Sequence, residues 1–297
     1  MRLWVAQSDY TADLRIGPEI LKGVSDSYRR LRNTMRFILG SLSEPTESEK
    51  IEPKDMPELE QWVLHRLSEL DERVRKGYTE YDFQGVFQSV FTFATVELSS
   101  FYFDIRKDVL YCDGDTLERR SARSVLDHIL VRLTAWLAPV LVFTMEEVWL
   151  ERYPGDESSI HLTDMPSTPK TWLNEELAKK WTVVRQARRA VTAALELQRT
   201  DKVIGSSLEA SPVVYLEDQE TFDILDSIPF TDICITSSIK LSLGKAPKTA
   251  FSTEEVKGIK VDFQVASGEK CQRCWKILPE VTNSNPICGR CDEALKG

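Results

Sequence analysis

The chain has 297 residues, of which 42% are hydrophobic and 29% charged, as expected for a globular protein with about two domains and a small additional module. Its most apolar stretch, residues 126–150, is interrupted by Asp127, Arg132 and Glu146, which excludes a membrane-spanning helix there. The formal net charge of -9 argues against DNA binding or indiscriminate binding of nucleic acid. The first thirty residues lack the pattern of a signal peptide, so a cytoplasmic location is expected.

Helical periodicity dominates the first half of the chain. Apolar residues at helical spacing predict helices over residues 24–42, 58–76 and 83–110, and a fourth over 116–153 that Pro139 breaks or kinks. A polar break, residues 43–57, separates the first two helices, and the turn 112–115 ends the third. We expect a helical bundle. The aromatic residues of the third helix fit its core better than a stacking platform: Phe87, Phe91, Phe93, Phe101, Tyr102 and Phe103.

The periodicity changes after the bundle. Residues 172–199 predict one further helix, and short strands are expected over 213–216, 232–236 and 260–265, with a helix over 219–225. The predicted fold is therefore mainly α, with a helical bundle followed by a small α/β region and a four-cysteine module. The expected divisions are residues 1–23, a bundle over 24–165, a connecting helix over 166–200, the α/β region over 201–266 and the cysteine module over 267–297.

The cysteine module contains two C-x2-C pairs, Cys271 with Cys274 and Cys288 with Cys291. Two such pairs supply the four thiolates of one tetrahedral zinc ion, and a closed shell of this kind is structural because it leaves no open position for water. Disulfides and a redox C-x-x-C are the alternatives, but a reducing compartment disfavours the first and a redox pair needs no twin. The other two cysteines, Cys112 and Cys234, are expected to be unpaired, packed thiols.

Two groups of residues are candidates for binding nucleic acid. Along the first helix, Arg29, Arg32, Asn33 and Arg36 share one face, and guanidinium groups pair well with phosphates. The alternative is a solvated face paired with acidic residues of the bundle. Beside the cysteines lie further cations and an aromatic ring: Lys270, Arg273, Trp275, Lys276 and Arg290. For the basic residues at 185, 188 and 189, a solvated helix face is the stronger interpretation.

Signatures of catalysis are missing from the sequence. It contains no Gly-rich phosphate loop, no His-x-Gly-His, no KMSKS motif and no nucleophile elbow. The three histidines, His65, His128 and His161, are scattered and are expected to be surface or helix residues. No catalytic residue is therefore assigned.

Five segments in the same order resemble bacterial-type isoleucyl-tRNA synthetases. MRLWVAQSDYTADLRIG (1–17) resembles the segment that follows their catalytic KMSKS loop, and YRRLRNTMRF (28–37) resembles the first helix of their anticodon-binding domain. ELSSFYFDIRKDVLY (97–111), KVIGSSLEA (202–210) and the zinc tail beginning CQRCW (271–275) are also similar. The resemblance covers essentially the whole chain, and the zinc tail with its Trp favours the isoleucine enzyme over its valine and leucine relatives.

The resemblance implies the C-terminal, tRNA-binding part of a ligase that attaches isoleucine to its tRNA, with residues 1–23 a remnant that follows the catalytic domain. ATP and Mg2+ would bind only in the missing catalytic domain, and the chain itself would be non-catalytic, monomeric and would hold one zinc ion. The bundle would hold the anticodon stem-loop through its basic face, while the zinc module contacts neighbouring nucleotides. A free-standing zinc-containing RNA-binding module and a zinc-stabilised protein-interaction bundle are the alternatives.

Overall fold

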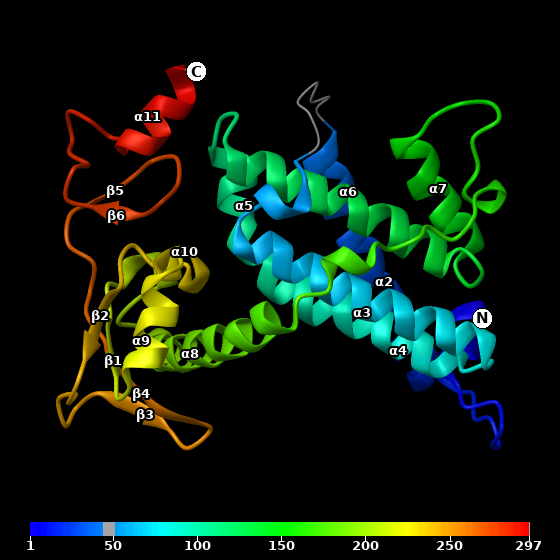
Figure 1. Ribbon diagram of the computed structural model, residues 1–297, viewed down its shortest axis with the longest axis horizontal. Helices are drawn as coiled ribbons and strands as arrows, with labels where there is room; N and C mark the ends of the chain where they lie inside the picture. The colour runs from blue at the N-terminus through cyan, green and yellow to red at the C-terminus, as the bar shows by residue number, and fades with distance from the viewer. Residues whose placement is uncertain (44–50, 297) are drawn as a thin grey trace. The chain divides into compact units, whose positions relative to one another are not determined.

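The computed structural model describes residues 1–43 and 51–296, so residues 44–50 of the expected polar break lie outside the described residues (Figure 1). The chain divides into two compact units. Unit 1 comprises residues 1–110 and 116–174, and unit 2 comprises residues 111–115 together with residues from 175 onward. Within the described ranges, no helix combines the length and apolar character needed to cross a membrane.

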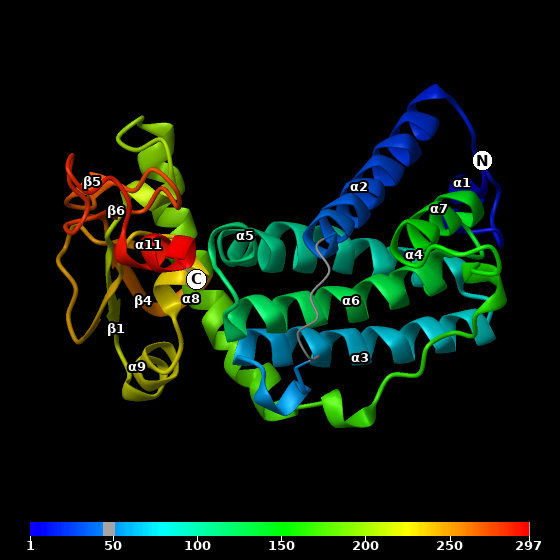
Figure 2. The same cartoon turned by 90° about the horizontal axis from the view of Figure 1, so that it is seen from above.

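Unit 1 is a helical bundle in which α6 packs against α2, α3 and α7 (Figure 2). Its α-helices are α1 (Arg2–Gln7), α2 (Pro18–Leu42), α3 (Glu58–Thr79), α4 (Phe83–Thr92), α5 (Phe103–Cys112), α6 (Leu117–Leu137) and α7 (Val142–Arg152), although the last two residues of α5 belong to unit 2. A π-helical segment, η2 (Phe93–Tyr102), joins α4 to α5, and short 3-10 turns lie at η1 (Pro53–Asp55), η3 (Ile160–Leu162) and η4 (Lys170–Trp172). The expected mainly helical fold and the expected bundle are confirmed.

The predicted helices are present, and two of them differ most from the expected bounds. The expected fourth helix is divided into α6 and α7 around Pro139, as the proline predicted. The first helix begins six residues earlier than expected, at Pro18, because a proline fits the first helical position and Gly17 precedes it as the cap. Residues of this extra turn, such as Ile20 and Leu21, are exposed, so no buried stripe marked it.

The third predicted helix forms one continuous helical run from α4 through η2 to α5. In the π-helical part, the Ser99 hydroxyl donates to the carbonyl of Ala94 (2.8 Å) and that of Ser100 to Thr95 (2.9 Å), both five residues earlier. The expectation of an aromatic core is confirmed, because these side chains are buried: Phe87, Phe93, Phe101, Tyr102 and Phe103. Phe91 stacks on Phe87 and is half-buried.

A buried ion pair lies inside the bundle. The guanidinium of Arg106 on α5 donates to both carboxylate oxygens of Glu60 on α3, at 2.7 and 2.6 Å, and the Tyr102 hydroxyl donates to the same carboxylate at 3.0 Å. Glu60 is 0% and Arg106 5% exposed. Burial opposes the charge of Arg106, but Glu60 offsets it and raises the pKa of the guanidinium. The pair therefore fixes the position of α5 relative to α3.

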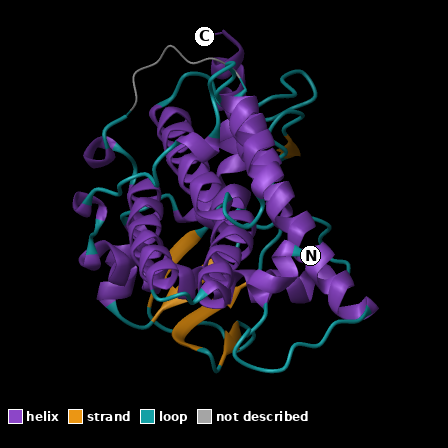
Figure 3. Cartoon of the chain, turned by 90° about the vertical axis from the view of Figure 1, so that its right-hand side faces the viewer, coloured by secondary structure: helices purple, strands orange, loops and turns teal. Residues whose placement is uncertain are grey.

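Unit 2 combines the long helix α8 (Glu175–Thr200) with a four-stranded sheet and the cysteine module (Figure 1). Figure 3 shows the strands of the chain in orange among the helices in purple. The sheet order is β2-β1-β4-β3, with β1 parallel to β2 and antiparallel to β4, and α8 packs against β4. The strands are β1 (Val213–Leu216), β2 (Lys240–Leu243), β3 (Phe251–Thr253) and β4 (Val256–Asp262). The remaining helices of the sheet region are η5 (Ser207–Glu209), α9 (Gln219–Asp226) and α10 (Phe230–Cys234).

The expected strand over residues 232–236 is wrong, since these residues fall on the helix α10 and its end. Pro229 precedes the helix, and its carbonyl accepts from the amides of Asp232 and Ile233. The β-branched residues predicted a strand, but Ile233 is buried and its carbonyl accepts a hydrogen bond from Arg188 on α8 (2.8 Å). Tertiary packing therefore overrides the local preference.

Gly77 marks the close approach of α3 to α4. A Cβ at this position would lie 2.4 Å from the Cγ2 of Val86, whereas one at Gly40 on α2 would meet nothing within 4 Å. We expect Gly77→Ala to lower the free energy of unfolding by about 1–3 kcal/mol, and Gly40→Ala to raise it by about 0.5–1 kcal/mol. Urea denaturation of the two variants checks this, and the same sign of change in both would contradict the packing described.

Candidate metal centre and nucleic-acid interface

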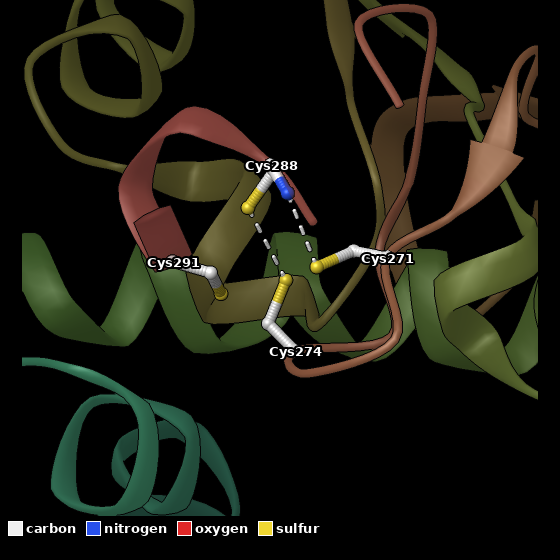
Figure 4. A group of neighbouring side chains, drawn as sticks. All are labelled: Cys271, Cys274, Cys288 and Cys291. Carbon is white, nitrogen blue, oxygen red and sulfur yellow. Dashed lines mark hydrogen bonds between the residues drawn. The ribbon is translucent and has the colours of Figure 1, made fainter. Parts of the chain in front are cut away.

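The four predicted ligands come together. The sulfur atoms of Cys271, Cys274, Cys288 and Cys291 all lie within 4.8 Å of one another, and all four residues are buried (Figure 4). The Sγ atoms of Cys274 and Cys288 are 3.7 Å apart. Zinc–sulfur bonds of about 2.3 Å in a tetrahedron place sulfur atoms about 3.8 Å apart. The cluster therefore fits one tetrahedral ion, and no disulfide joins these cysteines.

Two backbone turns aim the sulfur atoms at a common centre. Cys271 and Cys274 lie between the paired strands β5 (Glu269–Lys270) and β6 (Ile277–Leu278), and the amide of Trp275 donates to the carbonyl of Cys271 (3.0 Å). Trp275 itself has a φ of 68°, which closes this turn. Cys288 and Cys291 lie at the beginning of α11 (Gly289–Lys296), and the amide of Cys288 donates to the sulfur of Cys271 (3.4 Å).

The cluster is a small core of its own, with Val281 buried beside it and Cys112, Leu278 and Ile287 packed against it. Burial raises the pKa of the Cys274 and Cys288 thiols. At Cys271, burial also favours the neutral thiol, but hydrogen bonds from the neighbouring backbone outweigh it and lower the pKa to about 6. Zinc binds cysteines as thiolates. A cation at this centre therefore offsets the free-energy cost of burying four negative sulfur atoms.

The predicted RNA-binding cations beside the cysteines have partners within unit 2. Arg273 donates to the carbonyl of Cys112, and a guanidinium nitrogen of Arg290 lies 3.6 Å from the carboxylate of Asp113. Both partners belong to residues 111–115, the last two residues of α5 and the turn that follows it, here called loop 111–115. Sequence reasoning missed this loop as part of the site, because its partners are about 160 residues away along the chain.

Lys276 is likewise engaged, since its ammonium group lies 2.6 Å from the carboxylate of Asp232 on α10. By contrast, Trp275 is 60% exposed, and the ammonium group of Lys270 lies 5.5 Å from the centre of its ring. Of the candidates around the cysteines, Trp275 and Lys270 are thus the most available for a ligand, while the other three contact the protein itself.

The second candidate surface is the face of α2 that carries Arg29, Arg32, Asn33 and Arg36. Arg29 pairs with Asp26 on the same helix (3.0 Å), and Arg32 pairs with Glu147 on α7 (3.1 Å). Asn33 and Arg36 are exposed, and their side chains make no hydrogen bond or ion pair with any residue that the structure describes. Exposed pairs contribute at most about 1 kcal/mol, so a phosphate can replace the carboxylate partners at little cost.

The other candidates in the sequence have structural roles. Arg189 is exposed, as a solvated helix face predicts, and lies 3.8 Å from Glu255, whereas Arg188 is half-buried and donates to the carbonyl of Ile233. The histidines do not gather: His65 is buried in α3 and accepts from the amide of Asn174 (2.9 Å), while His128 lies against Trp172. His161 lies separately, in η3.

Comparison with known families assigns both parts of the chain. The family described as the anticodon-binding domain of tRNA ligase matches residues 60–214. The family described as the zinc finger found in FPG and IleRS matches residues 268–294, which include all four clustered cysteines.

Similar full-length proteins are much longer than this chain. The isoleucine--tRNA ligase of Ruegeria pomeroyi is 65% identical over 298 residues, which cover 99% of this chain and 31% of the relative. Those of Brucella abortus and Agrobacterium fabrum are 50% and 47% identical over 282 residues, covering 95% of this chain and 29% of each relative. The chain therefore spans about three tenths of the length of the curated relatives that it matches.

The anticodon-binding match covers more than half of the chain, including most of the bundle, and the zinc-finger match coincides with the cysteine cluster. The chain belongs to the anticodon-binding domain family of tRNA ligases and carries, on the same polypeptide, a zinc finger of the type found in FPG and IleRS.

Proposed function

We propose that this chain is the tRNA-binding part of a cytoplasmic isoleucine–tRNA ligase and that it binds isoleucine tRNA at the anticodon stem-loop, as a monomer. The observation that carries the proposal is the presence on one chain of an anticodon-binding match and an IleRS-type zinc finger. The relatives that share this combination are named isoleucine--tRNA ligases. Their greater length argues for an activity shared with other parts of a longer enzyme rather than for a free-standing module.

In this proposal, the residues of the chain hold RNA and perform no bond-making step. The ligase reaction uses ATP and Mg2+, and we assign both to the parts of the longer enzyme that carry the catalytic motifs absent from this sequence. Unpaired anticodon bases expose edges and faces that side chains can recognise. In this proposal, the tRNA is selected by contacts with residues other than those that carry out the reaction.

One structural zinc ion, held by Cys271, Cys274, Cys288 and Cys291, would supply a rigid cross-link between the two C-x2-C turns. A zinc ion with four thiolates is formally doubly negative, so the metal centre itself repels phosphate. The zinc then fixes the shape of the module, and the side chains around it make the contacts.

The basic face of α2 is assigned to the RNA backbone. Arg36 is exposed and has no intramolecular partner among the described residues, so its guanidinium can pair with a phosphate without breaking an existing contact. Arg29, Arg32 and Asn33 line the same face, and the first two would exchange a carboxylate partner for a phosphate.

We expect Arg36→Ala to weaken binding of isoleucine tRNA about tenfold at moderate salt, because one charged hydrogen bond is lost. The slope of log affinity against log salt concentration should also fall by about 0.7–0.9, the value for one phosphate contact. Filter binding at several salt concentrations measures both quantities. Arg189→Ala on α8 is the control and should leave them unchanged. Unchanged affinity and slope for Arg36→Ala would contradict the assignment of this face.

A further inference from the structure

The zinc module docks on loop 111–115, which comprises the end of α5 and the turn before α6. Arg273, from the first C-x2-C pair, donates to the carbonyl of Cys112, and the sulfur of Cys112 lies 3.8 Å from the carbonyl of Arg273. Arg290, from the second pair, faces Asp113. Both C-x2-C turns are therefore attached to one loop, and this loop belongs to the same compact unit as the zinc module.

Next to each end of this contact lies an exposed aromatic ring. Tyr111 directly precedes Cys112 and is 64% exposed, and Trp275 follows Arg273 by two residues and is 60% exposed. Consecutive Cα atoms are about 3.8 Å apart, and the Arg273 side chain contacts the carbonyl of Cys112. The Cα atoms of Tyr111 and Trp275 are therefore at most roughly 25 Å apart. A short single-stranded segment can cover such a span.

The charges nearby favour an aromatic mode of binding over a phosphate-binding mode. Arg273 and Arg290 are engaged with the loop, and Lys276 is engaged with Asp232. The cluster of four cysteines is itself anionic when it holds zinc. Lys270 lies over the Trp275 ring, which it can support by a cation–π contact. The exposed rings of Tyr111 and Trp275 are thus the side chains here that are best suited to contact RNA.

We propose that Tyr111 and Trp275 both stack on unpaired bases of the bound RNA, and that the docking of the zinc module on loop 111–115 holds the two rings in position. The proposal rests on the proposed tRNA-binding function and deepens it by adding Tyr111 as a binding residue. It also gives Arg273 and Arg290 a positioning role in place of direct RNA contact. Stacking on aromatic side chains needs no particular base, so these contacts add affinity more than sequence discrimination.

Alanine substitutions with salt titration test the stacking. Tyr111→Ala and Trp275→Ala should each weaken binding of isoleucine tRNA about 5- to 150-fold, the range for loss of one stacked base. Neither should alter the slope of log affinity against log salt concentration, because no phosphate contact is lost. Tyr111→Phe should retain nearly full affinity, since it keeps the ring. Tyr81→Ala, which removes a 66% exposed tyrosine from unit 1, is the matched control and should bind normally.

The positioning role is tested with a double-mutant cycle. Arg290→Ala should weaken tRNA binding in the parent chain but have little further effect in the Trp275→Ala background. The reason is that Arg290 contributes to binding by holding the Trp275 ring in position. Zinc content must stay at one per chain in Arg290→Ala, which separates a displaced module from an unfolded one. Additive effects of the two substitutions would overturn the positioning role.

The outcomes also separate this proposal from the proposed function. If the parent chain binds isoleucine tRNA and Tyr111→Ala binds equally well, the stacking role of Tyr111 is wrong and the tRNA-binding function stands. A changed salt slope in Tyr111→Ala, or an equal loss in Tyr81→Ala, would also overturn it. If the parent chain does not bind isoleucine tRNA at all, the proposed function itself fails.

Discussion

Cys274→Ser is expected to release the metal and unfold residues 268–296, while leaving the helices of unit 1 folded. The serine removes one of four converging sulfur atoms, and the remaining module has only a small core around Val281. Structural zinc sites contribute about 10–16 kcal/mol of binding free energy, and in modules this small that energy is also folding energy. Metal analysis of the purified protein measures the loss, and hydrogen exchange over residues 268–296 locates the unfolding.

Cys112→Ser is the sharpest control for this prediction. Cys112 packs against the same cluster but is not one of the four converging cysteines, so this variant should keep one zinc ion. A chelator added to the parent chain should reproduce the exchange pattern of Cys274→Ser. Retention of one tightly held zinc per chain by Cys274→Ser would contradict the four-cysteine site.

Arg106→Leu is expected to lower the free energy of unfolding of unit 1 by about 3–5 kcal/mol. The substitution leaves the carboxylate of Glu60 buried without its cation, and among the side chains that the structure describes only the Tyr102 hydroxyl still donates to it. Urea denaturation measures the loss, and hydrogen exchange in α3 and α5 assigns it to this pair. The protonated mimic Glu60→Gln should also destabilise, because it strands the buried guanidinium.

Two comparisons isolate the effect of burial. Arg29→Leu breaks an exposed pair with Asp26 and should change the free energy of unfolding by less than about 1 kcal/mol. The double substitution Glu60→Leu with Arg106→Leu removes both charges and should recover most of the stability lost by Arg106→Leu alone. If Arg106→Leu is no more destabilising than Arg29→Leu, the pair does not hold α3 and α5 together.

The helical part of the fold could be predicted because a buried stripe repeats at helical spacing. Leu31, Met35 and Ile38 show this on α2, and all three are buried. This pattern does not predict an element that buries few side chains. It also fails where packing against residues distant in the sequence determines the secondary structure. The strands β2 and β3 are short and contain no fully buried residue, which explains why no prediction included them. Residues 232–234 form a helix against α8 despite their strand-like composition.

The metal site was accessible to sequence reasoning for a different reason. Its ligands are recognised by residue type and by their spacing in the sequence. The two cysteines of each C-x2-C pair are close in the sequence and are therefore also close in the folded chain. The partners of the surrounding cations were not accessible, because Cys112, Asp113 and Asp232 are remote in sequence from Arg273, Arg290 and Lys276. No local pattern distinguishes a cation that contacts RNA from one that contacts its own chain.

Binding of two synthetic stem-loops tests most directly whether the chain recognises the anticodon. One carries the anticodon of isoleucine tRNA, and the other has the same stem with those three bases replaced. The chain should bind the first at least about fivefold more tightly at moderate salt, since a side chain that reads a base edge discriminates against a wrong base by about 1–3 kcal/mol. Equal affinities for the two stem-loops would contradict the assignment of this chain as an anticodon-reading part of an isoleucine–tRNA ligase.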